Sequence, residues 1–266
     1  MHTLRIWGLS CFLFFMGLVN LPAQQGVQQI SLESIHGMSV GSESETLATI
    51  RQRAVNEAKV AALQKAGIQE QIQSYSSYFQ SESREDFEEL FSSGIFTNIR
   101  GAVKDVRVVK TRKKFTDEGL PRIEVWIDCK VMKYHTKKDM AFIMEVEGVH
   151  SFYQHHDPLE FTVKPHKKGY LRAFVFTAQD AFQIFPNDYE SSFQMSAGSS
   201  YQFPRNSRLI LETQKKSEMH RLVLVYLKEN LPYVDGVTYK DILDWIFTIP
   251  PDQRTIKTFT FTVVRE

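Results

Sequence analysis

The segment GYLRAFVFTAQDAFQIFPNDYE, residues 169–190, decides the fold of the second half of the chain. Its first part, YLRAFVF, is mostly apolar on both sides of an extended chain. A strand with two apolar faces belongs in the middle of a sheet, because both of its sides must be covered. We therefore predict a central strand, a turn at Gln179 and Asp180, an antiparallel return strand AFQIF, and a loop that begins at Pro186.

Short apolar segments separated by turn residues continue through the rest of residues 139–266. They include MAFIMEVEGV, LEFTVKP, SYQF, RLILET and RLVLVYL. Short strands at this spacing are typical of an all-β sandwich. Near the end, Thr238 and Asp241 have the spacing of a helix cap before YKDILDWIF, which Pro250 ends, and TFTFTVV follows as a last strand. The sequence predicts a β-sandwich domain with a C-terminal helix over residues 139–266.

The first half of the chain mixes helices and strands. A strand is predicted over residues 30–40, and Ser42 with Glu45 has the spacing of a capping box, which predicts that a helix begins there. The helix places mostly alanine on one side and ends at Gly67, so it can lie unusually close to a sheet. The segment SESREDFEELF, residues 81–91, predicts a second, short helix with a solvated acidic face.

A β-hairpin is predicted over residues 95–134, around a turn at residues 116–121. Its second strand, RIEVWIDCKV, alternates apolar and polar residues, which puts Cys129 on the apolar face and Trp126 on the outward face. Cys129 is therefore expected to serve packing rather than nucleophilic chemistry. The first strand changes phase, which a β-bulge near Lys104 and Asp105 would explain. We predict an α+β fold in which a βαββ-type domain, residues 24–138, precedes the sandwich.

The first 23 residues have the pattern of a signal peptide. His2 and Arg5 precede an apolar run over residues 6–19, and Ala23 is a small residue of the kind that signal peptidase cuts after. The run is too short for a stable membrane anchor, which is the alternative, and Cys11 lies too early for lipoprotein processing. We expect an exported protein, periplasmic or extracellular, with no transmembrane segment in the mature chain.

Composition excludes several classes of function. Loss of Arg5 with the leader reduces the 32 basic residues to 31, equal to the 31 acidic ones, so the mature chain is formally neutral. Bulk charge then gives no long-range attraction to nucleic acid, and no nucleic-acid partner is expected. With Cys11 removed, Cys129 has no cysteine with which to form a disulfide. We expect no cofactor, because the sequence has no phosphate-binding glycine loop and no dinucleotide fingerprint.

Catalytic and metal-binding patterns are equally weak. The histidines near residue 155 are His150, His155, His156 and His166, and their spacing matches no HExxH helix, so exposed loop histidines are the default and a metal site the alternative. No GxSxG motif is present. We expect no enzymatic activity, although a concave pocket that holds a histidine and a carboxylate within hydrogen-bond reach would favour a hydrolase.

Two surfaces are candidates for binding. The first is the basic strand of the hairpin beside Trp126, with Arg107, Lys110, Arg112 and Lys113. It has two interpretations, a site for an anionic polymer or phosphate, or an exposed edge that lysine and arginine protect from aggregation. The second is the loop that follows AFQIF, formed by Pro186, Asn187, Asp188 and Tyr189 and reaching Glu190.

Two resemblances to known families add to these patterns. The segment RQRAVNEAKVAALQKAG, followed by a short helix and a hairpin that opens with IRGAVKDVRVV, resembles the βαββ domain of bacterial surface lipoproteins and of the flagellar outer-ring assembly protein. The order DPLEFTVKP, GYLRAFVF, IFPN, MSAG, YQFP and RLVLVYL resembles a bacterial domain-of-unknown-function family of exported proteins. The first resemblance implies a non-enzymatic assembly module of the cell envelope, and the second implies only a β-sandwich.

Together these observations give two hypotheses. The first is an exported, non-enzymatic interaction or assembly module whose partners are envelope proteins. The second is a glycan or peptidoglycan-binding protein, because Trp126 and many aromatic residues could stack on sugar rings. Exposure of these rings distinguishes the hypotheses, since stacking on a sugar needs an uncovered ring face.

Overall fold

The computed structural model describes residues 26–68, 72–80, 99–177, 180–234, 236 and 238–265. Within these residues the chain is a mixed α+β protein in which strands predominate, with three α-helices that include one near the C-terminus. The predicted signal peptide, the predicted helix over residues 81–91, the first residues of the predicted hairpin and the turn residue Gln179 lie outside the described residues. No helix in the described part of the chain is long and apolar enough to span a membrane.

The first sheet has three antiparallel strands. They are β1 (Val27–Val40), β2 (Gly101–Phe115) and β3 (Pro121–Tyr134), in the order β1-β3-β2. The predicted first strand and hairpin are confirmed, and β2 lies at an edge. The predicted bulge is also confirmed, since the register shifts between Lys104 and Arg107, where Asp105 has φ 52°. A second shift, between Val108 and Lys110, was not predicted.

Helix α1 (Leu47–Lys65) begins later than the capping-box spacing predicts. Its N-cap is Thr46, whose hydroxyl oxygen accepts a hydrogen bond from the Thr49 N–H at 3.2 Å. The Ser42 N–H does donate to the Glu45 carboxylate at 2.7 Å, but this contact closes a turn before the helix. The predicted start at Ser42 is therefore wrong, because Thr46 is an equally good cap and lies nearer the first buried residue.

The alanine face of α1 lies against β1, as predicted. A Cβ atom placed on Gly37 would lie 2.2 Å from the Ala54 carbonyl oxygen and 2.8 Å from the Ala58 Cβ. Both contacts are shorter than any that packed side chains tolerate, so only glycine fits at this position of the strand. After the helix, Gly67 takes φ +76°, which is the predicted stop.

Two further sheets form the second half. The five-stranded sheet has the order β5-β11-β10-β7-β8, and the three-stranded sheet has the order β4-β6-β9. Their strands are β4 (Met144–Glu147), β5 (Phe152–Gln154), β6 (Phe161–Pro165), β7 (Tyr170–Phe176), β8 (Ala181–Phe185), β9 (Tyr201–Phe203), β10 (Ser217–Leu227) and β11 (Arg254–Val264). The prediction for β7 is confirmed: it lies inside the sheet, and β8 pairs with it antiparallel.

One predicted strand of the second half is wrong and one strand was missed. Within RLILET, residues 208–213, only Ile210 forms an isolated bridge, to Pro158. Backbone hydrogen bonds do join this segment to residues 156–159, but proline has no N–H to donate, so a regular ladder cannot form. The missed strand is β5, which has three residues and runs parallel to β11.

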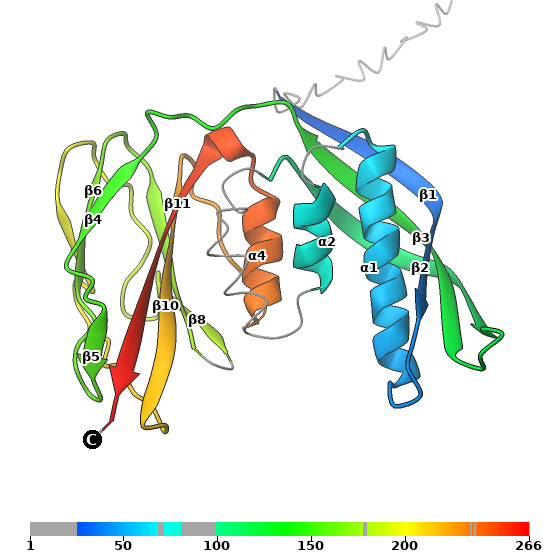
Figure 1. The fold of residues 1–266 in the computed structure, drawn as a ribbon. Helices are drawn as coiled ribbons and strands as arrows, with labels where there is room; N and C mark the ends of the chain where they lie inside the picture. The colour runs from blue at the N-terminus through cyan, green and yellow to red at the C-terminus, as the bar shows by residue number, and fades with distance from the viewer. Residues whose placement is uncertain are drawn as a thin grey trace, which may run out of the picture.

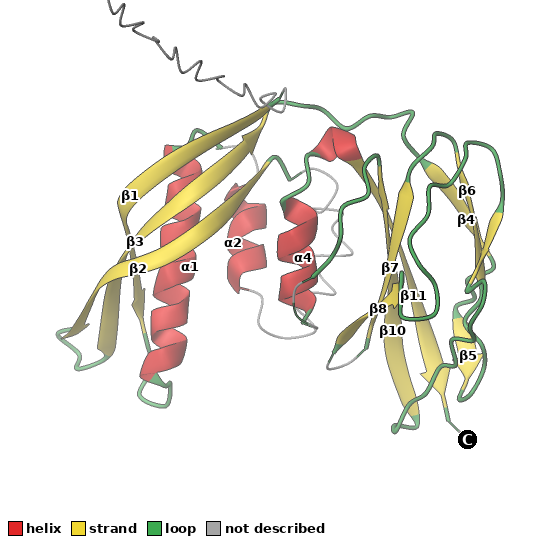
Figure 2. Cartoon of the chain, turned by 180° about the vertical axis from the view of Figure 1, so that it is seen from behind, coloured by secondary structure: helices red, strands yellow, loops and turns green. Residues whose placement is uncertain are grey.

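The elements stack in layers, seen edge-on in Figures 1 and 2. Helices α1, α2 (Ile72–Gln80) and α4 (Tyr239–Phe247) lie between the first sheet and the five-stranded sheet. The three-stranded sheet β4-β6-β9 lies beyond the five-stranded one. Thr238 caps α4 as predicted, and the short 3-10 helix η2 (Pro251–Gln253) leads into β11.

Helix α4 joins the two halves of the chain. The Trp245 ring lies 6.0 Å from that of Phe174 on β7, and the Phe247 ring lies 4.8 Å from that of Tyr78 on α2. One hydrophobic core therefore takes residues from the first sheet, all three helices and the five-stranded sheet. The expected boundary at residues 138 and 139 falls between β3 and β4, and this core has members on both sides of it. A second core fills the space between the five-stranded sheet and the sheet β4-β6-β9.

Candidate functional site

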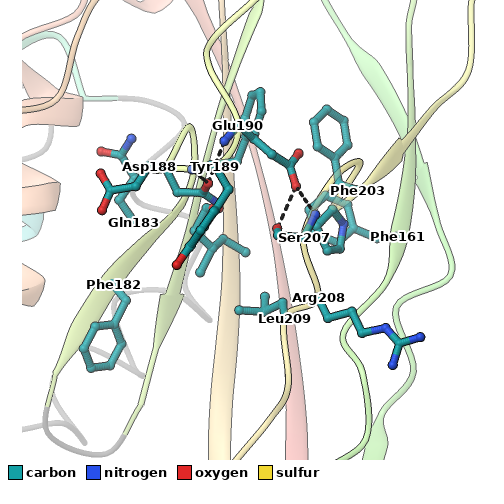
Figure 3. A pocket seen from close by; sticks show the side chains of 14 residues that line it. Phe161, Phe182, Gln183, Asp188, Tyr189, Glu190, Phe203, Ser207, Arg208 and Leu209 are labelled. Carbon is teal, nitrogen blue, oxygen red and sulfur yellow. Dashed lines mark hydrogen bonds between the residues drawn. The ribbon is translucent and has the colours of Figure 1, made fainter.

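A pocket of about 340 Å³ opens between the edges of the two sheets of the second half (Figure 3). Strand β8 is the edge of the five-stranded sheet and β9 is the edge of the sheet β4-β6-β9, and residues of both strands line the pocket. Its apolar wall consists of Phe161, Phe182, Ile184, Phe185, Phe203, Pro204 and Leu209. The pocket is thus a mostly apolar hollow at a place where two sheet edges lie near each other without pairing.

The predicted loop after β8 forms one rim of this pocket. Asn187, Asp188 and Tyr189 line it, whereas Pro186 does not. The Asn187 side chain uses its polar atoms within the loop: Oδ1 accepts from the Tyr189 N–H at 2.9 Å, and Nδ2 donates to the Ile184 carbonyl at 2.7 Å. Asn187 therefore has a structural role, and it holds the loop in the conformation that displays Tyr189.

Glu190 fastens the loop to the opposite wall. Its carboxylate is buried and accepts hydrogen bonds from the backbone N–H groups of Arg205, Asn206 and Ser207 at 2.9–3.1 Å. The Ser207 hydroxyl adds a bond of 2.7 Å (Figure 3). Burial alone would raise the pKa of Glu190, but these donors favour the charged form and hold its pKa below the usual value. Both rims of the pocket are therefore fixed relative to each other.

Two aromatic side chains are exposed at the mouth. Tyr189 is 80% exposed and Phe182 is 46% exposed, and Asp188 and Arg208 are also exposed beside them (Figure 3). An isolated exposed aromatic ring needs no explanation, but two rings that flank an apolar hollow form a patch of the kind that marks interaction sites.

The groups at this pocket are poorly arranged for catalysis. The Glu190 carboxylate already accepts from three amides and a hydroxyl, and its lowered pKa makes it a poor proton carrier near neutral pH. The Ser207 hydroxyl donates to this carboxylate, and no histidine is among the described residues that line the pocket. A nucleophile with an adjacent general base is thus not present among the lining residues.

Trp126 lies on the outward face of the first sheet, as predicted, but its ring is flanked by cations. It is half-buried; the Lys110 Nζ lies 4.8 Å from the ring centroid and the Arg112 Cζ lies 5.5 Å from it. On the other side, the His36 ring lies 4.9 Å away. These contacts are cation–π and ring packing within the sheet, so the indole is part of a cross-strand cluster.

The basic residues that were predicted beside Trp126 do not all lie on the same face of the sheet, because the strand register places them on both faces. Arg107 forms a 2.7 Å ion pair with Asp128, and Arg112 lies 3.8 Å from Glu124 on the same outward face. Lys113 is opposite Ile123, whose side chain is buried, so it belongs to the other face of the sheet. The structure therefore brings Lys110, Arg112 and Trp126 together and separates Lys113 from them.

The structure also describes the surroundings of Cys129 and of the histidines near residue 155. Cys129 is buried, and burial raises the pKa of its thiol, as expected for a packing residue. The rings of His155 and His156 lie 3.9 Å apart, and His155 Nδ1 accepts from the Thr213 N–H at 3.2 Å. Within the described residues, no group of three histidine, cysteine, aspartate or glutamate side chains is placed to hold a metal ion.

Sequence reasoning found one rim of the pocket and missed the other. The missed residues follow β9 and include Ser207, Arg208 and Leu209. Strand β9, which positions them, pairs with β6, about 40 residues earlier in the chain, so no local pattern indicated that they would meet the loop after β8.

Comparison with known protein families agrees with the expected domain of unknown function in the second half of the chain. The sequence model of a domain of unknown function, DUF4384, matches residues 152–224, which run from β5 into β10. All residues that line the pocket fall inside this match. The second half of the chain therefore contains a domain of unknown function. No curated protein sequence matches the chain.

Proposed function

We propose that the chain is an exported, non-enzymatic protein of the cell envelope that acts as an interaction or assembly module. We further propose that it receives an apolar side chain of a protein partner in the pocket between β8 and β9. The single observation that carries the proposal is this apolar hollow of about 340 Å³ with Tyr189 and Phe182 exposed at its mouth.

The composition of the mouth favours a protein partner. Tyrosine, phenylalanine and arginine are enriched at the centres of protein interfaces, and Tyr189, Phe182 and Arg208 occur together here. The loop is already held by Asn187 and Glu190, so binding would cost little ordering entropy. A partner side chain that fills the hollow would gain about 1.5–3 kcal/mol from burial of an apolar group of ordinary size.

Two further observations support a role without catalysis. Among the described residues that line the pocket, the carboxylates are Asp188, which is exposed, and Glu190, which accepts hydrogen bonds from residues 205–207. The residues that line the pocket include no histidine or cysteine. A ligand would therefore bind at this site through shape complementarity and apolar contacts.

The location and the finer fold are part of the same proposal. Export rests on the leader pattern of residues 1–23. The strand and helix order of residues 24–138 and the resemblance to envelope assembly domains support a βαββ-type module. The core shared by the five-stranded sheet and the sheet β4-β6-β9 supports a β-sandwich classification for residues 139–266.

Binding of a cell-wall glycan is the alternative, and Tyr189 is the observation that favours it. All ten tyrosines of the chain lie among the residues that the structure describes, and of these Tyr189 alone is exposed. Trp126 favours this alternative less, because Lys110, Arg112 and His36 flank its ring. Stacking on sugar would then depend on Tyr189 and its neighbour Phe182, the two exposed rings at the mouth of the pocket.

Affinity capture with matched variants tests the proposal. The tagged chain, Phe182→Ser and Phe152→Ser are expressed in their native cells, and proteins cross-linked to each are quantified. Phe152 is the control, because it is 72% exposed but does not line the pocket. We expect one envelope protein to be retained by the wild type and by Phe152→Ser and lost with Phe182→Ser.

A parallel sedimentation assay with purified peptidoglycan distinguishes the alternative. Sedimentation that is lost with Tyr189→Ala, together with no protein that depends on Phe182, would replace the proposal by the glycan alternative. Capture that is equal for all three variants would reject the pocket as the binding site.

A further inference from the structure

A second cavity, of about 390 Å³, lies at the end of the first sheet, next to the C-terminal end of α1. It is lined by Gly67 and Ile68 after the helix, by Arg100 before β2, and by residues 133–137 at the end of β3. No residue of this cavity belongs to the pocket between β8 and β9 or to the Trp126 cluster. It is therefore a separate feature, which the proposed function does not use.

The lining of this cavity is basic. Four of its eight residues are Arg100, Lys133, His135 and Lys137, and none is acidic. Neither Lys133 nor Lys137 forms an ion pair with the part of the chain that the structure describes. In a chain with nearly equal numbers of acidic and basic residues, two neighbouring lysines without a counter-charge among the described residues attract anions locally.

The Lys133 ammonium group is held in place by two hydrogen bonds and has one N–H left to donate. Its Nζ donates to the carbonyl oxygens of Ala66 and Gly67, each at 3.1 Å, at the end of α1. These carbonyls are neutral acceptors, so they orient the ammonium group without cancelling its charge. An ammonium group has three hydrogens, and the third is left for a ligand.

Thr136 supplies a second donor. Its hydroxyl oxygen is buried and has no hydrogen-bond partner among the described residues. The Cγ2 methyl group of Thr136 packs against Gly26: a Cβ atom added to that glycine would lie 2.3 Å from it. The hydroxyl group therefore points in a different direction from the methyl group. A buried hydroxyl without a partner is costly, and an oxygen of a ligand in the cavity would satisfy it.

We propose that this cavity binds a phosphate group, carried either by free phosphate or by the headgroup of an anionic lipid. A phosphate has up to two negative charges and several acceptor oxygens, which matches two lysines and a buried hydroxyl donor better than a carboxylate does. Lys133 and Thr136 donate to its oxygens, and Lys137 supplies further positive charge beside it.

Binding of inorganic phosphate to the full chain, measured by calorimetry, tests the proposal with three variants. Lys137→Gln removes one charge, and Thr136→Val removes the hydroxyl while keeping the shape. Lys113→Gln is the control, because it removes an exposed lysine that does not line the cavity. We expect affinity to fall about tenfold with Lys137→Gln and about fivefold with Thr136→Val, and to stay unchanged in the control.

Vesicles distinguish the source of the phosphate group. Co-sedimentation with vesicles of phosphatidylglycerol and phosphatidylcholine, but not of phosphatidylcholine alone, that is lost with Lys137→Gln would assign a lipid headgroup. Saturable phosphate binding without vesicle binding would assign a free phosphate. Thermal unfolding of each variant confirms that it is folded. The proposal is overturned if neither probe binds, or if both cavity variants bind as the control does.

Discussion

The hydroxyl of Tyr78 on α2 donates a 2.5 Å hydrogen bond to Oδ1 of Asp244 on α4. A second bond of 2.7 Å joins the Tyr134 hydroxyl to the Phe247 carbonyl. Both bonds link the first half of the sequence to the last helix, beside the hydrophobic core to which Tyr78 and Phe247 belong and which takes residues from both halves. The halves are therefore expected to unfold together rather than one after the other.

Replacement of Tyr78 by Phe should lower the free energy of unfolding by about 1 kcal/mol, because one hydrogen bond is lost while the packed ring remains. Urea unfolding followed by circular dichroism and by tryptophan fluorescence should give coincident transitions for wild type and variant. Tyr189→Phe, which removes an exposed hydroxyl, is the control and should change stability little. Two separate transitions in the wild type would contradict the shared core.

Gly37→Ala should destabilise the chain by more than about 3 kcal/mol, since the new methyl group would overlap backbone atoms of α1 that cannot move aside. Ser39→Ala, two residues further along the same face of β1, should stay within about 0.5 kcal/mol of the wild type. Denaturant midpoints measure both. A tolerated alanine at position 37 would mean that the helix lies farther from the sheet than the contacts indicate.

Glu190→Gln should lower stability by about 2 kcal/mol at neutral pH, because the amides of residues 205–207 then face a neutral acceptor. The pKa of Glu190 is lowered in the folded chain, so its contribution is present above the unfolded pKa of about 4.3 and is lost as pH falls through the folded value. The difference between variant and wild type should therefore shrink below about pH 4.

Unfolding free energies between neutral pH and about pH 3 measure this effect. Glu147→Gln, at an exposed glutamate of β4, should show no such dependence. A difference for Glu190→Gln that stayed constant down to the lowest pH would mean that the carboxylate charge does not hold the rim.

Trp126→Leu should leave binding to peptidoglycan unchanged, because Lys110, Arg112 and His36 flank the ring and keep it from stacking on a sugar. The loss of the cation–π contacts should cost about 0.5–1 kcal/mol of stability. Sedimentation with purified peptidoglycan and urea unfolding check the two parts. Loss of sedimentation in a stably folded variant would restore Trp126 as a ligand contact.

Local patterns predicted the elements whose periodicity was long and regular. Strand β7 was found because it is apolar on both sides, and α4 because Thr238 and Pro250 mark its ends. The start of α1 was misplaced because Ser42 and Thr46 are both good caps, and only packing against β1 selects between them. Residues 208–213 look like a strand, but their neighbour contains Pro158, which no local pattern could reveal.

The candidate site was only half predictable for a related reason. The loop from Pro186 follows directly from a recognisable strand, so its position was apparent. The opposite rim at Ser207 depends on pairing between β6 and β9, which are distant in sequence. The joining of the halves through α4 is likewise non-local, because Tyr78 and Asp244 are 166 residues apart.

Photo-cross-linking from position 189 in living cells tests the central claim most directly. A photoreactive phenylalanine replaces Tyr189, and the same group at Phe152 is the control. The account predicts a cross-link from position 189 to one envelope protein, absent from position 152 and lost when Phe182→Ser is added. No protein cross-link from position 189, or one that Phe182→Ser leaves unchanged, would contradict the assignment of this pocket as the partner-binding site.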